Sequence, residues 1–284
     1  MAPFDTGLAP TSAPDVALRH IVADCRAALR KYRAMVLQGR RPIGIHQTRV
    51  ALRRLRAAFG LFRHTVDGPV LRALSAEAKW LAGECAPARD LHVFLTETVE
   101  DVPPVIQRIA RRLAETHIQR ARSALSGARF EAFDRQLRAF VDLSPAHPAE
   151  RLDHFALAEL DQHHEKVMHR GRKVDSLDPH HLHRLRIAIK KLRYAAEFLQ
   201  PAFASDVAKP YIEATVRLQS ALGAMNDRAV ARHMLADLAT AARPSEDARR
   251  PLKRLAKQTE AGEKRRRRKL ERAWKAFRKT DKFW

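Results

Sequence analysis

The chain of 284 residues has a formal charge of +22, because 54 lysine and arginine residues outnumber 32 aspartate and glutamate residues. A hydrophobic content of 45% excludes a disordered basic tail and is enough for one or two packed domains. With two cysteines, no apolar run of membrane-spanning length and no secretion signal, we expect a cytoplasmic protein with a polyanionic partner.

The elements predicted along the chain are all helices. Residues 1–14 are rich in Pro, Thr, Ser and Ala without helical periodicity, which predicts a flexible N-terminus. From residue 15 onward, apolar residues recur every three or four positions, as in amphipathic helices. Proline and glycine divide this stretch into about eight to ten helices. We place the main breaks near residues 39–42, 67–69, 86–87, 103–104, 144–148, 178–179, 201, 210 and 243–244.

An internal repeat relates the two halves of the chain. The segment from His46 to Arg56 recurs from His183 to Arg193, an offset of 137 residues. The same offset continues without a gap through Leu81 and Leu218, Asp90 and Asp227, and Phe140 and Phe277. We therefore predict a duplication. The expected fold is all-α, with two antiparallel four-helix bundles, residues 15–144 and 145–284, related by a pseudo-twofold axis.

The repeated segment predicts a cationic helix face in each half. At about 100° per residue, the basic side chains of each copy fall within a face about 80° wide, beside a separate apolar stripe. The first basic stripe is His46, Arg49, Arg53 and Arg56, and the second basic stripe is His183, Arg186, Lys190 and Arg193. Like charges so close repel one another, and no acidic residue lies within either stripe. Guanidinium groups match phosphate oxygens, so the stripes predict binding to a row of phosphates.

Aromatic residues bear on the choice of polyanion. They make up 6% of the chain, and none lies on the first basic stripe. Tyr194 is close to the second stripe, but the matching residue of the first is Ala57. Base stacking is therefore not indicated. The backbone of a nucleic-acid duplex and inorganic polyphosphate both remain open.

The two stripes, together with the pairs Arg89-Asp90 and Asn226-Asp227 that follow them, resemble the CHAD family, the conserved histidine α-helical domain. The resemblance implies two four-helix bundles around a basic cavity or channel that binds inorganic polyphosphate, without catalysis, and an association with polyphosphate granules. By motif, the residues facing the polyanion would be His46, Arg49, Arg53, Arg54, Arg56, His183, Arg186, Lys190, Lys191 and Arg193.

A second family motif is intact in one half only. Residues 222–227 read Leu-Gly-Ala-Met-Asn-Asp as the family pattern requires, whereas residues 85–90 read Cys-Ala-Pro-Ala-Arg-Asp. We expect this departure to alter the geometry of a turn in the first half. Asp90 and Asp227 cannot attract phosphate because they are acidic, and Asn226 lies next to Asp227. They are expected to support the site by orienting a stripe arginine or capping a helix.

Other basic residues could extend the binding surface. The secondary positions that we predict are Arg33, Arg170, Arg89, Arg112, Arg249, Arg120 and Lys257. Residues 243–284 carry 17 lysines and arginines against 6 acidic residues, including the unbroken basic run 264–269. This run is expected either to steer anions or to contact the ligand directly.

Several other functions are not indicated. The 14 histidines show no metal-ligand spacing, so no metal and no cofactor are expected. Nucleophile-elbow and phosphate-loop motifs are absent, as is the Glu-x-Glu-x-Lys strand of triphosphate-processing domains. We therefore expect a binding protein and no enzyme. A nucleoid-like nucleic-acid-binding protein is the alternative, and a triphosphate-processing enzyme is a third, less favoured one.

Overall fold

The computed structural model describes residues 8–39, 41–66, 68–143, 150–203, 207–242, 246–260 and 262–284, without the side chains of residues 41, 226–229 and 246. Helices make up most of the described part, and no strand occurs in it, so the all-α prediction is confirmed. The ten α-helices are α1 (Pro14–Leu37), α2 (Arg41–Leu61), α3 (Gly68–Val93), α4 (Pro104–Ser126), α5 (Ala128–Asp142), α6 (Leu152–Gly171), α7 (Pro179–Leu199), α8 (Lys209–Ala242), α9 (Glu246–Glu260) and α10 (Glu263–Arg278).

Three short helical turns complete the described elements. A π-helical turn, η1 (Phe94–Thr98), extends α3, and two 3₁₀ turns, η2 (Val174–Ser176) and η3 (Gln200–Ala202), flank α7. Prolines start several helices, because the N–H that proline lacks has no partner in a first helical turn. Pro179 starts α7 in this way, and the Asp178 carboxylate accepts a hydrogen bond from the His181 backbone N–H at 2.9 Å. The start of the helix that bears the second basic stripe is thereby fixed.

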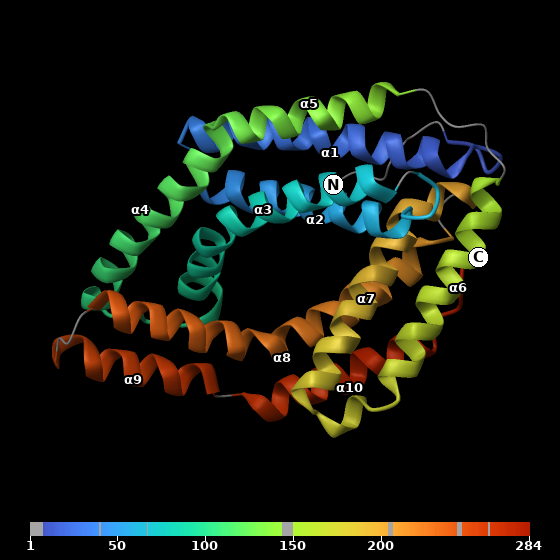
Figure 1. Cartoon of the computed structure of the whole chain (residues 1–284). Helices are drawn as coiled ribbons and strands as arrows, with labels where there is room; N and C mark the ends of the chain where they lie inside the picture. Colours follow the sequence, from blue (N-terminus) through green and yellow to red (C-terminus); the bar gives the residue numbers. More distant parts are fainter. Residues whose placement is uncertain are drawn as a thin grey trace.

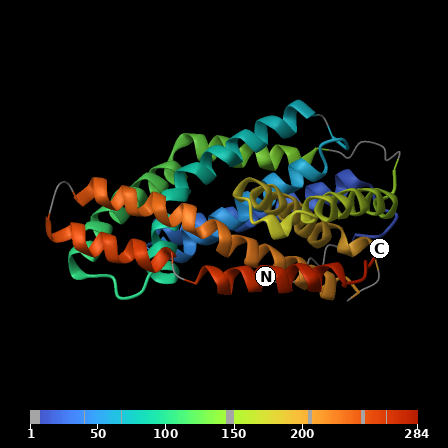
Figure 2. The same cartoon turned by 90° about the horizontal axis from the view of Figure 1, so that it is seen from below.

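The helices form two groups (Figure 1). Helices α1, α2, α3 and α5 pack together, and α6, α7, α8 and α10 form the other group. The two groups meet where α2 contacts α7. The two halves of the chain also meet where α4 of the first half contacts α8 and α9 of the second half. The view turned by 90° shows α8, α9 and α10 running along one side of an elongated molecule (Figure 2).

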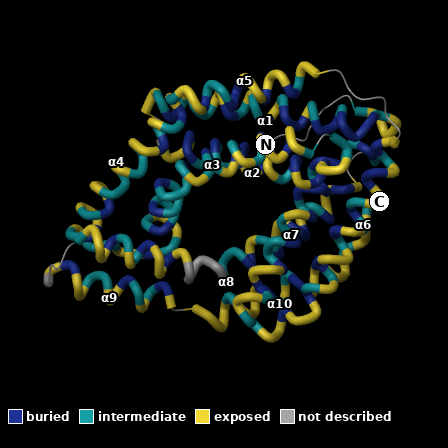
Figure 3. The backbone as a smooth tube through the Cα atoms, viewed as in Figure 1, coloured by how far each residue is buried: buried dark blue, intermediate teal, exposed yellow. Residues whose placement is uncertain are grey.

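Two hydrophobic clusters hold these groups together. The larger joins both groups, and its fully buried side chains include Phe62 of the loop after α2, Phe130 of α5 and Phe198 of α7. The smaller lies at the far end, where Phe94 of η1 and Leu238 of α8 pack with residues of α4 and α9. Buried and exposed residues alternate along each helix, as amphipathic helices require (Figure 3).

The helices of the two halves follow the same order. Adding 137 to the bounds of α2 gives 178–198, and α7 spans Pro179–Leu199; adding it to those of α5 gives 265–279, and α10 spans Glu263–Arg278. The neighbouring pairs α1–α2, α2–α3, α3–α4 and α3–α5 recur as α6–α7, α7–α8, α8–α9 and α8–α10. Equivalent helices therefore have equivalent neighbours in these pairs.

One predicted break is wrong. The break near residues 86–87 does not occur, because Pro87 lies inside α3, and the matching motif at residues 222–227 also lies inside a helix, α8. One proline removes a single helical hydrogen bond, and a long helix packed against neighbours on both sides can bear that loss. The turn expected at residues 85–90 is therefore a continuous helix.

Parts of the domain prediction lie outside the described residues. These are residues 1–7 of the expected flexible N-terminus and the predicted junction at residues 144–148. The remainder of the N-terminal segment lies against α6. The carbonyls of Pro10 and Ser12 accept hydrogen bonds from the backbone N–H groups of Asp153 and Leu152, at 3.0 and 2.8 Å.

Candidate polyanion-binding site

The two basic stripes come together where α2 lies against α7. Arg53 of α2 donates a hydrogen bond from Nε to the hydroxyl oxygen of Tyr194 of α7, with a distance of 2.6 Å. Beside it, Arg54 Nη1 lies 2.9 Å from a carboxylate oxygen of Glu197. Residues more than 140 positions apart in the sequence thus form one site.

A pocket of about 180 Å³ lies at this junction, and we call it the central pocket. Its basic residues come from both halves, and none of its described lining residues is a carboxylate. They are Arg53, Arg56, Arg63, His163, Lys190 and Lys191, with Gly60 and Tyr194 among the others. The central pocket therefore concentrates positive charge that no acidic lining residue neutralises.

The pKa values of both lysines in the central pocket are lowered. Burial lowers the pKa of Lys190, and the nearby Arg186, Arg53 and Arg56 lower it further. The pKa of Lys191 is also lowered, first by burial and then by Arg63 and other cations. An anion bound here would relieve this repulsion between cations.

His163 of α6 also lines the central pocket but, unlike its arginines and lysines, is uncharged at neutral pH. Burial lowers its pKa to about 4, and Lys166, Lys191 and Arg63 contribute. Its Nε2 lies 3.6 Å from a carboxylate oxygen of Glu159 on the same helix. At neutral pH, His163 can therefore donate or accept a hydrogen bond but adds no charge.

The amino-terminal part of the first stripe faces α3. Arg49 donates a hydrogen bond to the Ala82 carbonyl oxygen at 2.8 Å, and its other terminal nitrogen lies 4.0 Å from Asp90 Oδ1. Burial, followed by Arg89 and Arg53, lowers the pKa of His46. Arg89 thus belongs to this cationic cluster, although its guanidinium also lies 3.2 Å from Glu97.

The amino-terminal part of the second stripe lines a separate pocket of about 290 Å³ between α7, α8 and α10. The polar lining residues of this pocket are His183, Arg186, Arg232, Arg266 and Glu263, and its apolar lining includes Leu222. Within the described part of the chain, the buried Nε of Arg186 has no hydrogen-bond partner. An acceptor in this pocket would satisfy that nitrogen.

Two predicted binding residues have an internal partner that the sequence reasoning missed. Glu197 of α7 lies between Arg54 and Arg193, at 2.9 and 2.5 Å, and all three side chains are largely buried. Arg193 also donates from Nε to Gln219 at 2.9 Å. The signal for one of these pairs was present, because Glu197 follows Arg193 by four residues on a helix. Nothing local connects Glu197 to Arg54.

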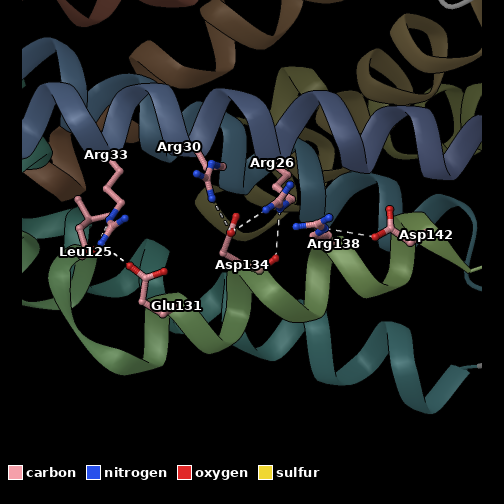
Figure 4. A network of polar contacts seen from close by, with 8 residues as sticks. All are labelled: Arg26, Arg30, Arg33, Leu125, Glu131, Asp134, Arg138 and Asp142. Carbon is pink, nitrogen blue, oxygen red and sulfur yellow. Dashed lines mark hydrogen bonds and ion pairs between the residues drawn. The ribbon is translucent and has the colours of Figure 1, made fainter.

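The predicted secondary residues lie in different surroundings. Arg33 joins α1 to α4 through the Leu125 carbonyl at 2.7 Å and to α5 through Glu131 at 2.5 Å (Figure 4). Arg120 pairs with Glu84 at 2.6 Å, and Arg170 donates to the Arg184 carbonyl at 3.0 Å. Three others are exposed on α4 and α9, namely Arg112, Arg249 and Lys257. The side chains of Asn226 and Asp227 lie outside the described residues.

Neither a metal-binding cluster nor a membrane-spanning helix occurs within the described ranges. No group of three or more His, Cys, Asp or Glu side chains lies close enough to hold a metal ion there. No described helix is long and apolar enough to cross a membrane. Both cysteines, Cys25 and Cys85, are buried and free, and burial raises the pKa of each to about 12.

Comparison with known proteins identifies the family. A family model described as the CHAD domain matches residues 20–236, and no curated protein matches the chain. The crystal structure of the CHAD domain from the plant Ricinus communis is similar over 99% of this chain and 98% of its own, with a TM-score of 0.82 and 26% sequence identity. PptA from Streptomyces chartreusis has a related fold, with a TM-score of 0.61 and 18% identity over 94% of this chain and 98% of its own. Because the family model covers well over half of it, the chain belongs to the CHAD domain family.

Proposed function

We propose that this protein binds inorganic polyphosphate across the junction of α2 and α7. The observation that carries the proposal is the central pocket, where Arg53 and Arg56 of one half meet Lys190 and Lys191 of the other without a lining carboxylate. Four cations held so close repel one another, and a row of phosphates would neutralise them. Each phosphate bound releases condensed counterions, so affinity would fall steeply with salt.

The surroundings of Tyr194 favour polyphosphate over single-stranded nucleic acid. The ring is 2% exposed, stacks on Phe198 with centroids 5.8 Å apart, and has Arg193 over it at 4.3 Å. A ring buried in this way offers no face on which a base could stack. The site can therefore bind phosphate groups, but the Tyr194 ring is not available to stack on a base.

Three wider elements of the proposal come from the family resemblance and the sequence repeat. We propose binding without catalysis, a cytoplasmic location, and association with polyphosphate granules. We also propose that the two halves arose by duplication and form two bundles related by a pseudo-twofold axis. The recurring order of helices and the pairing of their neighbours support the last point.

The test is a titration of polyphosphate of defined length into the protein at two salt concentrations. The charge reversals Arg56→Glu and Lys190→Glu, combined, should abolish binding, because both side chains line the central pocket. The matched control combines Arg135→Glu and Lys275→Glu, which reverse one exposed arginine and one exposed lysine on α5 and α10. The control should bind nearly as well as the wild type, with a loss that grows only at low salt. Equal binding by both variants would place the site elsewhere.

Competition distinguishes the alternative functions. The basic run 264–269 lies on α10, and all of its residues except Arg266 are exposed. This run could attract duplex DNA. If DNA of equal total charge displaces polyphosphate, the nucleic-acid function is favoured instead. Release of phosphate on incubation with a divalent cation would favour a triphosphate-processing enzyme.

A further inference from the structure

The central pocket lacks a carboxylate that its counterpart across the sequence repeat has. The offset of 137 residues pairs Arg56 with Arg193, Arg54 with Lys191, and Gly60 with Glu197. On one side of the α2–α7 junction, Glu197 therefore places a carboxylate between Arg54 and Arg193, at 2.9 and 2.5 Å. On the other side, Arg56, Lys191 and Gly60 line the central pocket.

Gly60 leaves that position open. Gly60 is exposed, and a Cβ atom added to it would meet no heavy atom within 4 Å among the described residues. The central pocket of about 180 Å³ beside it has room for about six water molecules, at roughly 30 Å³ each. A group the size of phosphate fits this space.

We infer that the central pocket holds one phosphate group of the bound chain, in the position that the Glu197 carboxylate takes on the other side, and that Glu197 keeps that other side closed to phosphate. This inference rests on the proposed function. Carboxylate and phosphate oxygens accept the same charge-assisted hydrogen bonds from guanidinium and ammonium groups. The Glu197 carboxylate is therefore an example, within the protein itself, of an anion bound between α2 and α7.

The charges on the two sides support the same conclusion. Arg54, Arg193 and Glu197 together carry one positive charge, and each arginine donates one hydrogen bond to the Glu197 carboxylate. In the central pocket, Arg56 and Lys191 have no ion-pair partner among the described residues, and Arg53, Arg63 and Lys190 add further charge. The polymer would therefore be anchored on one side of the junction, so that the two halves of the chain bind unequally.

The decisive variant is Gly60→Glu, which supplies the central pocket with the carboxylate that the other side already has. We expect polyphosphate to bind at least about tenfold more weakly, the loss of one charge-assisted contact. Gly60→Ala alters the same position without charge, so the difference in affinity between Gly60→Glu and Gly60→Ala measures the effect of the carboxylate. Ala139→Glu adds the same charge on an exposed position of α5 and should also bind like the wild type, after the small effect of net charge.

The reciprocal variant is Glu197→Gln, which keeps the shape of the side chain and removes its charge. Because Arg54 and Arg193 then lack a counter-ion, polyphosphate should bind more tightly and with a steeper dependence on salt. Thermal unfolding followed by circular dichroism identifies a variant that has lost its fold. If Glu197→Gln does not fold, the test of the inference rests on Gly60→Glu, because a Cβ atom at position 60 meets no heavy atom of the described residues within 4 Å.

The outcomes separate this inference from the proposed function. If Gly60→Glu binds polyphosphate like the wild type while the combined Arg56→Glu and Lys190→Glu variant does not, the phosphate position in the central pocket is wrong and the proposed function stands. If Glu197→Gln folds but binds no more tightly, Glu197 does not close the other side. A wild-type protein that does not bind polyphosphate would overturn the proposed function and this inference together.

Discussion

Arg53 of α2 and Tyr194 of α7 are joined by a hydrogen bond of 2.6 Å, from the guanidinium Nε to the phenol oxygen. The Tyr194 ring is buried, whereas Arg53 is exposed and lines the central pocket. The phenol therefore holds a cationic side chain of one half in position from the other half. Because the single hydrogen of Nε is donated to Tyr194, a ligand would be bound by the two terminal nitrogens of Arg53.

We predict that Tyr194→Phe weakens both stability and binding. The ring stays buried in the variant, so the expected loss is that of one hydrogen bond to a charged group, about 1 kcal/mol in the free energy of unfolding. Polyphosphate affinity should fall by a few-fold, because Arg53 must then be ordered by the ligand. Denaturant unfolding and polyphosphate titration measure the two effects.

Tyr32→Phe is the matched control for Tyr194→Phe. Tyr32 lies half-buried on α1, and its hydroxyl makes no hydrogen bond with any described residue. Removing this hydroxyl should change neither unfolding nor binding. If both tyrosine variants behave alike, the Arg53 contact has no functional role.

The sequence predicted the faces of the helices but not which partners they would meet. Helical periodicity placed Arg53, Arg56 and Lys190 on two cationic faces, and the family motif added Lys191. The structure brings these four residues to one pocket. Glu197 was missed because its contact with Arg54 joins residues 143 positions apart. Periodicity along one helix carries no information about contacts of that range.

The same limit explains the residues whose surroundings the sequence did not reveal. Arg33 was predicted as a secondary binding residue because the repeat offset of 137 relates it to Arg170. In the structure it contacts Leu125 and Glu131, which lie 92 and 98 positions away in the sequence. Pro87 suggested a break, because proline disfavours a helix interior in general. Here α3 packs against α2, α4 and α5, and these tertiary contacts outweigh the local preference.

A network between α1 and α5 is predicted to contribute to stability but not to binding. The Asp134 carboxylate is 8% exposed and lies 2.7 Å from Arg26 and 2.9 Å from Arg30 (Figure 4). Asp134→Asn should lower the free energy of unfolding by about 2 kcal/mol, because it weakens charge-assisted hydrogen bonds to a buried group. Polyphosphate affinity should not fall, since Asp134 does not line the central pocket.

The neighbouring pair of Arg138 and Asp142 provides the control for this network. These side chains are 70% and 61% exposed and lie 3.3 Å apart (Figure 4). Asp142→Asn should therefore cost less than about 0.5 kcal/mol. Chemical denaturation of the two variants side by side decides the prediction, and equal losses would contradict it.

Two glycines are predicted to respond in opposite directions to alanine. A Cβ atom on Gly171, at the end of α6, would lie 1.9 Å from a ring carbon of Trp274 in α10. Gly171→Ala should destabilise the protein by about 1 to 3 kcal/mol, because a buried ring must move. Gly60→Ala should instead stabilise it by about 0.5 to 1 kcal/mol, since the site is open and alanine favours the helix. Melting temperatures that shift in the same direction would contradict the prediction.

The buried His163 is predicted to make stability depend on pH. Its pKa is lowered from 6.5 to about 4 in the folded protein by burial and by Lys166, Lys191 and Arg63. The unfolded chain therefore binds a proton more readily than the folded chain between these two pH values. Stability should fall as the pH drops below about 6.5, by up to roughly 3 kcal/mol near pH 4 from this group.

The variant His163→Gln isolates the contribution of this group from that of the carboxylates. The difference in unfolding free energy between variant and wild type should move in the variant's favour as the pH falls from 7 to 5, because glutamine does not bind a proton. His233→Gln is the control, since the His233 side chain is 75% exposed on α8. Denaturant unfolding at several pH values gives the comparison. Parallel stability curves for wild type and His163→Gln would mean that the folded state protonates His163 as readily as the unfolded chain does.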